Sequence, residues 1–371
     1  MDLDYERQLS EKQDFIEDVL SPYGRVAPIV GMEDPTHYRS KIQAVFGIDR
    51  RNRIISGIYA SGTHHIVPIF DCLVEDSDAD RVLGTIRQLM SNFSIEPYDE
   101  DMNTGYIRHV LIKKSTFTSQ MMVVLVCGAW PIPHADDFLN ILRQRHPEIK
   151  TILLNINNDK TSMVLSDIPE KILIGPGFIE EKIADLWFRI SAKSFFQVNP
   201  RQAEVLYKIA MKMAQIKPTD FVIDAYCGTG TIGMIAASLG AKEVLGIELN
   251  EEAIKDAEAN KVRNRLENIQ FVCDDASSCL KQMAKDKKSC DVLFLDPPRQ
   301  GSDERFLASA IKLAPKTIIY ISCNINTLDR DLNYLMRFSD YEVKGIQPVD
   351  MFPHTTHVET IVLLSRADGE K

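Results

Sequence analysis

Residues 221–233 read FVIDAYCGTGTIG, an apolar run that continues as a glycine-rich turn. Gly228, Gly230 and Gly233 have the GxGxxG spacing, which permits a tight turn and lets a ligand approach the backbone closely. Glu248 ends the next apolar run, where a carboxylate can bind the hydroxyls of a ribose. The stretch therefore predicts a buried strand that leads into a binding loop for a ligand containing adenosine.

From this strand onward, apolar runs alternate with amphipathic helical stretches up to residue 336. Buried parallel strands read as continuous apolar runs, and the connections between them are helices. Two later apolar segments, residues 341–352 and 357–366, indicate an antiparallel hairpin at one sheet edge because little more than a turn separates them. The pattern predicts an α/β fold with a Rossmann-like, doubly wound, mostly parallel sheet. Its ligands should lie at the carboxyl ends of the strands.

The first half of the chain has a different pattern. We expect helices at residues 5–20, 80–92 and 135–144, with short segments of alternating polarity between them. This mixture is typical of an α+β domain. The sequence therefore predicts two domains, a smaller α+β accessory domain over residues 1–190 and the α/β domain over residues 191–371.

The 371 residues include 43 Lys and Arg against 53 Asp and Glu, a formal charge of −10. This acidity weighs against a nucleic-acid partner, although Arg39, Lys41, Arg50, Arg51 and Arg53 form a local basic cluster. No apolar stretch approaches roughly 18 residues, and the N-terminus is too charged for a secretory signal. We therefore expect a cytoplasmic protein with no membrane partner. Seven cysteines without a CxxC pair predict neither a disulfide framework nor a structural zinc site.

Three further strand boundaries carry side chains suited to chemistry. Asp296 precedes Pro297 and Pro298, which remove two backbone donors and hold a stiff exit that fixes the position of the carboxylate. Cys323 ends the fifth apolar run of the alternation, TIIYISC (317–323). It is the best candidate nucleophile, because it lies beside the expected ligand crevice. Glu359 opens the last strand and gains a role if it faces Cys323.

The chain resembles the RNA uracil-5-methyltransferase family, which has ribosomal-RNA (RumA-like) and transfer-RNA (TrmA-like) branches. The resemblance covers roughly residues 1–366 and is carried by five segments in a fixed order: FFQVNP (195–200), DAYCGTG (224–230), DPPRQG (296–301), SCN (322–324) and HVE (357–359). It implies S-adenosylmethionine as the methyl donor and a methyltransferase domain over residues 191–371. It also implies a uridine in RNA as the substrate, and we expect ribosomal RNA rather than transfer RNA.

Matching the motifs implies roles for individual residues. Cys323 matches the nucleophile that adds to C6 of the uracil, and Glu359 matches the base that removes the C5 proton to leave 5-methyluridine. Phe195 matches an aromatic residue that packs on the uracil, and Asp296 matches a contact to both the donor and the target base. The other positions that match donor contacts are Gln197, Tyr226, Gly228, Thr231, Glu248 and Asp275.

The chain departs from many relatives in its N-terminal part. Those relatives begin with an RNA-binding TRAM domain, followed by a segment that supplies three cysteines to an iron–sulfur cluster, and this sequence has neither. Cys72 matches the position of the fourth cluster cysteine but has no upstream cysteine partners, so we predict no iron–sulfur cluster and no metal site.

Three alternatives remain open at the level of sequence. The same chemistry could act on transfer RNA. The GxGxxG turn could serve an NAD(P)-dependent oxidoreductase, but that function leaves Asp296, Cys323 and Glu359 without roles. A catalytically silent RNA-binding protein would have no need of both Cys323 and Glu359. We expect no obligate protein partner.

Overall fold

The computed structural model describes residues 4–366, which form two compact units. Unit 1 combines the N-terminal residues up to Pro35 with Ile183–Phe188 and the chain from Ser194 onward. Unit 2 consists of Thr36–Lys182 and Arg189–Lys193. The chain therefore starts in unit 1, forms unit 2 and then returns to unit 1. Within residues 4–366, no helix has the combination of length and apolar character needed to cross a membrane.

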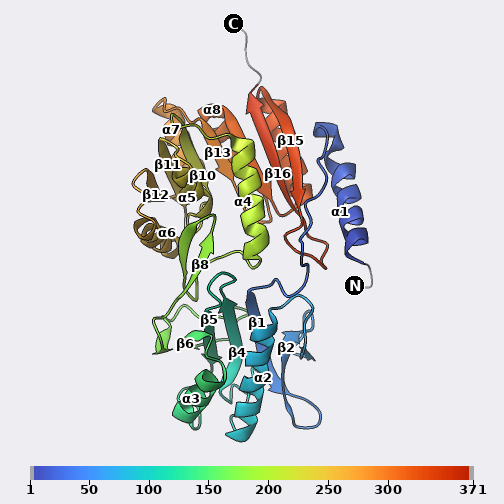
Figure 1. The fold of residues 1–371 in the computed structure, drawn as a ribbon, viewed down its shortest axis with the longest axis vertical. Coiled ribbons are helices and arrows are strands. Elements are labelled where there is room, and N and C mark those ends of the chain that lie inside the picture. Colours follow the sequence, from blue (N-terminus) through green and yellow to red (C-terminus); the bar gives the residue numbers. More distant parts are fainter. Residues whose placement is uncertain (1–3, 367–371) are drawn as a thin grey trace. The chain divides into compact units, whose positions relative to one another are not determined.

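The described part of unit 1 is built on a seven-stranded sheet with the order β12-β11-β10-β13-β14-β16-β15 (Figure 1). Neighbouring strands from β10 to β14 are parallel, whereas β16 is antiparallel to both β14 and β15. The predicted α/β sheet with its terminal hairpin is thereby confirmed. The strands are β10 (Phe221–Ala225), β11 (Glu243–Glu248), β12 (Ile269–Cys273), β13 (Val292–Leu295), β14 (Thr317–Ser322), β15 (Tyr341–Val349) and β16 (Glu359–Arg366).

Helices cover both faces of this sheet because side chains alternate between the faces along each strand. Ile223 and Leu293 belong to one apolar core with residues of α8 and α9, whereas Val222 and Phe294 belong to a second core with α4 and α5. The helices of unit 1 that follow residue 194 are α4 (Pro200–Ala214), α5 (Thr231–Ser238), α6 (Glu251–Arg263), α7 (Ala276–Lys285), α8 (Glu304–Leu313) and α9 (Ile325–Phe338).

The first helix, α1 (Tyr5–Leu20), has the predicted bounds. Asp4 caps it by accepting a hydrogen bond from the Arg7 backbone N–H, and its buried residues, which recur every four positions, are Gln8, Lys12, Ile16 and Leu20. Ile16 and Leu20 lie in the same core as α8 and α9. Helix α1 is thus part of unit 1, next to β15 in Figure 1.

The segment after α1 explains why the N-terminal residues belong to unit 1. Beyond the short 3₁₀ helix η1 (Ser21–Tyr23), Ala27 N–H donates to the Ile346 carbonyl and Val30 N–H donates to the Pro348 carbonyl. These bonds cover the free edge of β15, which would otherwise present unpaired backbone groups. The observed units therefore differ from the expected division at residue 190 in placing the N-terminal residues with the C-terminal sheet.

Unit 2 has its own sheet, with the order β3-β2-β1-β4-β5-β6-β7 among the described residues, and only the pairing of β5 with β6 is parallel. Helices α2 and α3 pack on it through one apolar core. The elements of this unit are β1 (Lys41–Ile48), β2 (Ile54–Tyr59), β3 (Ile66–Pro68), α2 (Ser77–Asn92), β4 (Ile107–Lys114), β5 (Met121–Cys127), α3 (Ala135–Arg145), β6 (Ile149–Ile156) and β7 (Lys171–Ile174). The hairpin of β8 (Ile179–Ile183) and β9 (Leu186–Ile190) contributes residues to both units.

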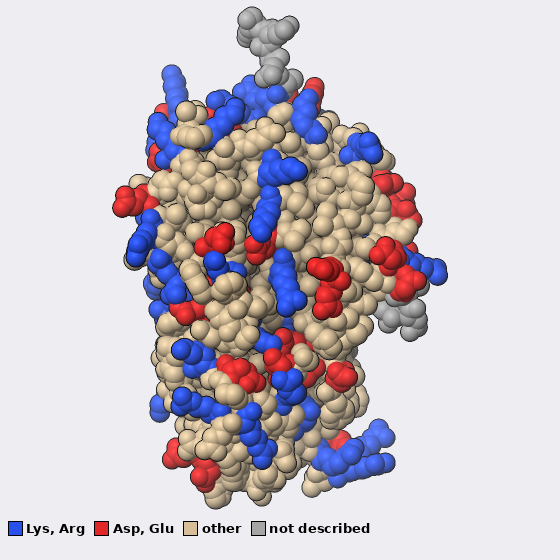
Figure 2. All heavy atoms as spheres, viewed as in Figure 1, with Lys and Arg blue, Asp and Glu red and all other residues tan. Residues whose placement is uncertain are grey.

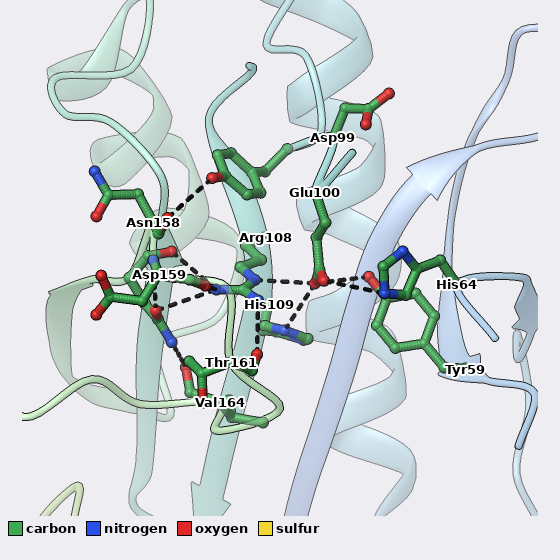
Figure 3. A network of polar contacts seen from close by, with 12 residues as sticks. Tyr59, His64, Asp99, Glu100, Arg108, His109, Asn158, Asp159, Thr161 and Val164 are labelled. Atoms are coloured by element: carbon green, nitrogen blue, oxygen red, sulfur yellow. Dashed lines mark hydrogen bonds and ion pairs between the residues drawn. The ribbon is translucent and has the colours of Figure 1, made fainter. Parts of the chain in front are cut away.

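A buried arginine organises one end of unit 2 (Figure 3). Arg108 on β4 donates to the Glu100 carboxylate at 3.0 Å and to the carbonyls of Asp159 and Thr161, both at 2.9 Å. A buried charge is tolerated only when it is paired and hydrogen-bonded in this way. The network fastens the loop after β6 to the sheet, which is a structural role.

Candidate active site

The glycine-rich turn after β10 is shaped by positive φ angles. Tyr226, Gly228 and Gly230 have φ of 63°, 54° and 81°, a region that glycine adopts without strain. A Cβ on Gly230 would lie 2.5 Å from the Phe271 ring, whereas a Cβ on Gly228 would meet no atom within 4 Å. The turn is therefore closely packed on one side and open on the other, where a ligand can approach the backbone.

Glu248 at the end of β11 holds this turn in place. Its Oε2 accepts a hydrogen bond from the Gly228 N–H at 3.1 Å, and its Oε1 accepts one from the Asn250 N–H at 2.9 Å. Each carboxylate oxygen can accept a second bond, and the side chain is only partly buried. Glu248 can therefore hold the loop and still bind ribose hydroxyls beside the open face of Gly228, an arrangement that fits a donor containing adenosine.

Asp224, a buried acid within β10, supports the loop from beneath. Its Oδ2 accepts the Gly233 N–H at 2.7 Å in the first turn of α5, while its Oδ1 has no hydrogen-bond partner. Burial raises the pKa of Asp224 to about 8. Its part in the site is to hold the start of α5 against the strand end.

Two further candidate donor contacts are placed by helix starts. Thr231 is the first residue of α5, directly after the N-cap Gly230. Asp275 is the N-cap of α7 and accepts a hydrogen bond from the Ser278 N–H at 2.9 Å. Tyr226 lies close enough to Asp275 for the charge of that acid to act on its hydroxyl, and its ring packs on Phe306. Burial raises the pKa of Tyr226 to about 12.

Two adjacent aromatic residues precede α4, Phe195 and Phe196, and their surroundings differ. Phe196 packs against Phe188 at 5.9 Å between ring centroids, whereas Phe195 is 66% exposed. Asn199 caps α4 and donates to the Met351 carbonyl at 3.0 Å, which fixes this segment to the loop after β15. Phe195 is thus the ring available for stacking, and Phe196 is the ring that belongs to the core.

Register places Cys323 beside Glu359. Ser322, the last residue of β14, pairs with Thr360 on the antiparallel strand β16. The register ends at this pair, and the residues next to it, Cys323 after Ser322 and Glu359 before Thr360, lie at the same end of the sheet. Their charges interact, because Glu359 raises the pKa of the Cys323 thiol. Cys323 and Glu359 thus lie at one end of the sheet, which is consistent with the role that the sequence suggested for Glu359.

Asp296 completes a cluster of three ionisable groups at this sheet end. It follows β13, the strand between β10 and β14, and it retains some exposed surface. Burial raises the pKa of Asp296 to about 7. Burial, reinforced by the Asp296 charge, raises the pKa of Glu359 to about 8, and burial with both carboxylates raises the pKa of Cys323 to about 11.

Two residues that interact with this cluster, Arg299 and Tyr207, were not identified as site residues from the sequence. Arg299 counteracts the negative charge, since it lowers the pKa values of both Glu359 and Cys323. The hydroxyl of Tyr207, buried on α4, hydrogen-bonds the Gln197 side chain, and burial together with the negative charges of Asp296 and Glu359 raises its pKa. Arg299 lies within the DPPRQG segment and could have been singled out there. Tyr207 sits in an ordinary amphipathic helix, where no pattern distinguishes it from a core residue.

The cysteines carry no metal centre in the described part of the chain. The structure describes every cysteine and leaves all seven thiols free. Within residues 4–366, no group of three or more His, Cys, Asp or Glu side chains could hold a metal ion. Cys72 is partly buried, and its backbone N–H donates to Asp80.

Comparison with known proteins identifies the family. The model of the tRNA (uracil-5-)-methyltransferase family matches residues 141–367. A protein of Oceanobacillus iheyensis and one of Clostridium acetobutylicum, both named as uncharacterized RNA methyltransferases, are each 39% identical to this chain. The alignments cover 98% and 99% of this chain, respectively, and 80% of each relative.

A solved structure agrees with this assignment. The Pyrococcus abyssi tRNA (uracil-54, C5)-methyltransferase in complex with S-adenosyl-L-homocysteine is 25% identical and has a TM-score of 0.80, over 98% of this chain and 84% of that one. These matches exclude the oxidoreductase alternative. The chain belongs to the tRNA (uracil-5-)-methyltransferase family and is an S-adenosylmethionine-dependent RNA methyltransferase.

Proposed function

We propose that this chain methylates C5 of a uridine in ribosomal RNA through a covalent bond between Cys323 and C6 of the base. The observation that carries the proposal is the meeting of Cys323, Glu359 and Asp296 at the carboxyl end of the sheet that also bears the glycine loop. Ribosomal RNA is the substrate expected from the sequence, and transfer RNA is the alternative that the test below distinguishes.

The nucleophile is needed because C5 of uracil attacks a methyl sulfonium poorly unless the ring is first activated. When bound, S-adenosylmethionine supplies that electrophilic methyl group. The Cys323 thiol loses its proton as Sγ forms a bond to C6, which places electron density on C5. C5 then bonds to the methyl group as the donor's S–CH3 bond breaks, and S-adenosylhomocysteine would be the leaving group. Glu359 removes the proton that remains on C5. The C6–S bond then breaks, the thiolate leaves, and 5-methyluridine is released.

Other side chains bind and orient. Asp296 is held rigidly by Pro297 and Pro298, so its carboxylate can accept the N3–H of the uracil. The exposed ring of Phe195 stacks on the base. We assign the donor to the glycine loop, with contacts from Gln197, Tyr226, Gly228, Thr231, Glu248, Asp275 and Asp296.

Unit 2 is proposed to contact the RNA outside the catalytic pocket. Its basic cluster is less charged than the sequence suggests, because Asp49 forms an ion pair with Arg53 at 2.7 Å. On the face shown in Figure 2, Lys and Arg are interspersed with Asp and Glu. The distribution of charge therefore does not by itself identify an RNA-binding surface. Independently of that surface, the target uridine must be flipped out of its strand to reach Cys323.

The test uses unmodified transcripts of bacterial 23S ribosomal RNA and of transfer RNAs, incubated with the purified protein and a donor carrying a deuterated methyl group. Digestion to nucleosides and mass spectrometry should find the label in 5-methyluridine from the 23S transcript. Label in 5-methyluridine from transfer RNA alone would overturn the choice of substrate. Label in any other nucleoside would overturn the chemistry.

A further inference from the structure

A cavity of about 620 Å³ opens beside Cys323, and one of its walls is the N-terminal helix α1. On the catalytic side it is lined by Cys323, Asn326, Thr356 and Arg299. Its volume lies within the range of about 300–1,000 Å³ that is usual for sites binding whole small molecules. The hollow therefore extends beyond the catalytic thiol as far as α1.

The α1 wall presents an aromatic side chain that packing does not explain. The buried positions of α1 recur every four residues from Gln8 to Leu20, and Phe15 lies outside that series. Its ring is 45% exposed and lines the cavity. An exposed aromatic ring in a cavity offers a flat apolar surface on which a nucleic-acid base can stack.

Polar residues of α1, among them Gln8 and Lys12 of the cavity lining, fix this wall to the rest of unit 1. Lys12 Nζ donates to Asp350 Oδ1 at 2.7 Å, and Tyr5 O–H donates to Asp350 Oδ2 at 2.9 Å. The His354 N–H donates to Gln8 Oε1 at 3.0 Å. These bonds join α1, and with it the wall that carries Phe15, to the loop after β15.

The charges in the cavity suit a nucleotide lying between α1 and Cys323. Glu11, the acidic residue of the α1 wall, pairs with Arg7 at 3.4 Å. The exposed Arg299 lies on the catalytic side, where its charge reaches Cys323. The backbone phosphate that joins the target nucleotide to its neighbour can therefore approach Arg299, while the base of that neighbour turns toward Phe15.

We infer that this cavity is a second base pocket, in which the nucleotide next to the target uridine stacks on Phe15. The inference rests on the proposed function, since it is the uracil bound at Cys323 that brings its neighbour into the cavity. Helix α1 thereby contributes directly to RNA binding, although it lies outside the α/β alternation that forms the donor site.

The first test measures methylation of the 23S ribosomal RNA transcript by the full chain. Phe15→Ala should raise KM for the transcript about 5- to 100-fold, the effect expected for loss of one stacked base, and should leave KM for the donor unchanged. Phe15→Tyr should retain the wild-type KM, because its ring still stacks. Phe338→Ala, which removes an exposed ring at the end of α9, is the matched control and should change neither constant.

The second test does not depend on turnover. Replacing Phe15 by the photoreactive residue p-benzoylphenylalanine should crosslink it to the transcript at a nucleotide directly adjoining the methylated uridine. A crosslink confined to distant nucleotides, or Phe15→Ala values equal to those of Phe338→Ala, would overturn the pocket while leaving the proposed function intact. Wild-type protein that methylates no uridine in the transcript would overturn the proposed function and the pocket with it.

Discussion

Cys323 is the residue whose removal separates covalent catalysis from donor binding. Replacing Cys323 by Ala removes the group that adds to C6, so methylation should be abolished. The donor should still bind with near wild-type affinity, since Cys323 is not among its proposed contacts. Single-turnover assays with labelled donor, together with calorimetric titration of the donor, check both expectations. Residual turnover near the wild-type rate would remove the covalent mechanism.

In the proposed mechanism, Glu359 governs release of the product. With Glu359→Gln the C5 proton stays in place, so the methylated RNA should remain attached to Cys323 and survive denaturing electrophoresis. Loss of a general base typically costs about 10²- to 10⁴-fold in rate. Glu342→Gln, on the neighbouring strand β15, changes an exposed carboxylate and should form no lasting adduct. Absence of the adduct with a good RNA substrate would show that Glu359 is not the eliminating base.

The raised pKa values also predict how stability depends on pH. Glu359 has a pKa of about 8 in the folded protein against about 4.3 in an unfolded chain, so the folded state holds more protons between these values. The free energy of unfolding should therefore fall as pH rises through this window. Glu359→Gln removes that loss. The free energy of unfolding of the variant minus that of wild type should therefore be larger at pH 8.5 than at pH 5.5, by on the order of 1–3 kcal/mol. Urea titrations at both pH values measure this difference, and an equal effect at each pH would contradict it.

At the scale of the element, α1 braces the loop that leads into β16. Lys12 and Asp350 form an ion pair whose side chains are 7% and 0% exposed, and removing one partner of such a pair costs about 3–5 kcal/mol. Lys12→Met should therefore lower the free energy of unfolding by that amount and reduce kcat, because Glu359 follows the braced loop. Chemical denaturation and turnover assays measure the two effects.

The control for this brace is an exposed ion pair on α4. Lys208 and Glu204 lie 2.6 Å apart with side chains 64% and 33% exposed, so Lys208→Met should cost less than about 1 kcal/mol. Adding Asp350→Asn to Lys12→Met removes the uncompensated charge and should recover part of the loss. A cost for Lys12→Met as small as that for Lys208→Met would contradict the role of α1.

Elements with strong local signals were predictable from the sequence. The expected helix over residues 5–20 has the observed bounds of α1, and the alternation after residue 221 gives the observed parallel strands, because both patterns depend on near neighbours. Strand β7 (Lys171–Ile174) was missed, since it is short and half exposed and has little apolar periodicity. Its pairing with β6 is a long-range contact that no local pattern records.

At the scale of the whole molecule, the division of the chain into two units depends on contacts between residues that are far apart in the sequence. Lys12 and Asp350 are separated by 338 positions, and the edge of β15 is covered by residues 26–30. Asp296, Cys323 and Glu359 could be proposed from the sequence because each ends or opens an apolar run, whereas Phe195 and Gln197 were proposed only from the resemblance of their segment to the family. Tyr207 and the α1 wall were not, since their roles arise only when distant helices meet the strand ends.

The central claim is that this chain makes 5-methyluridine in ribosomal RNA. The most direct measurement is mass-spectrometric mapping of 5-methyluridine in ribosomal and transfer RNA from cells that contain the protein and from cells that lack it. We expect 5-methyluridine to disappear from ribosomal RNA when the protein is absent and to return with the wild-type gene but not with Cys323→Ala. Unchanged 5-methyluridine in ribosomal RNA of cells without the protein would contradict it.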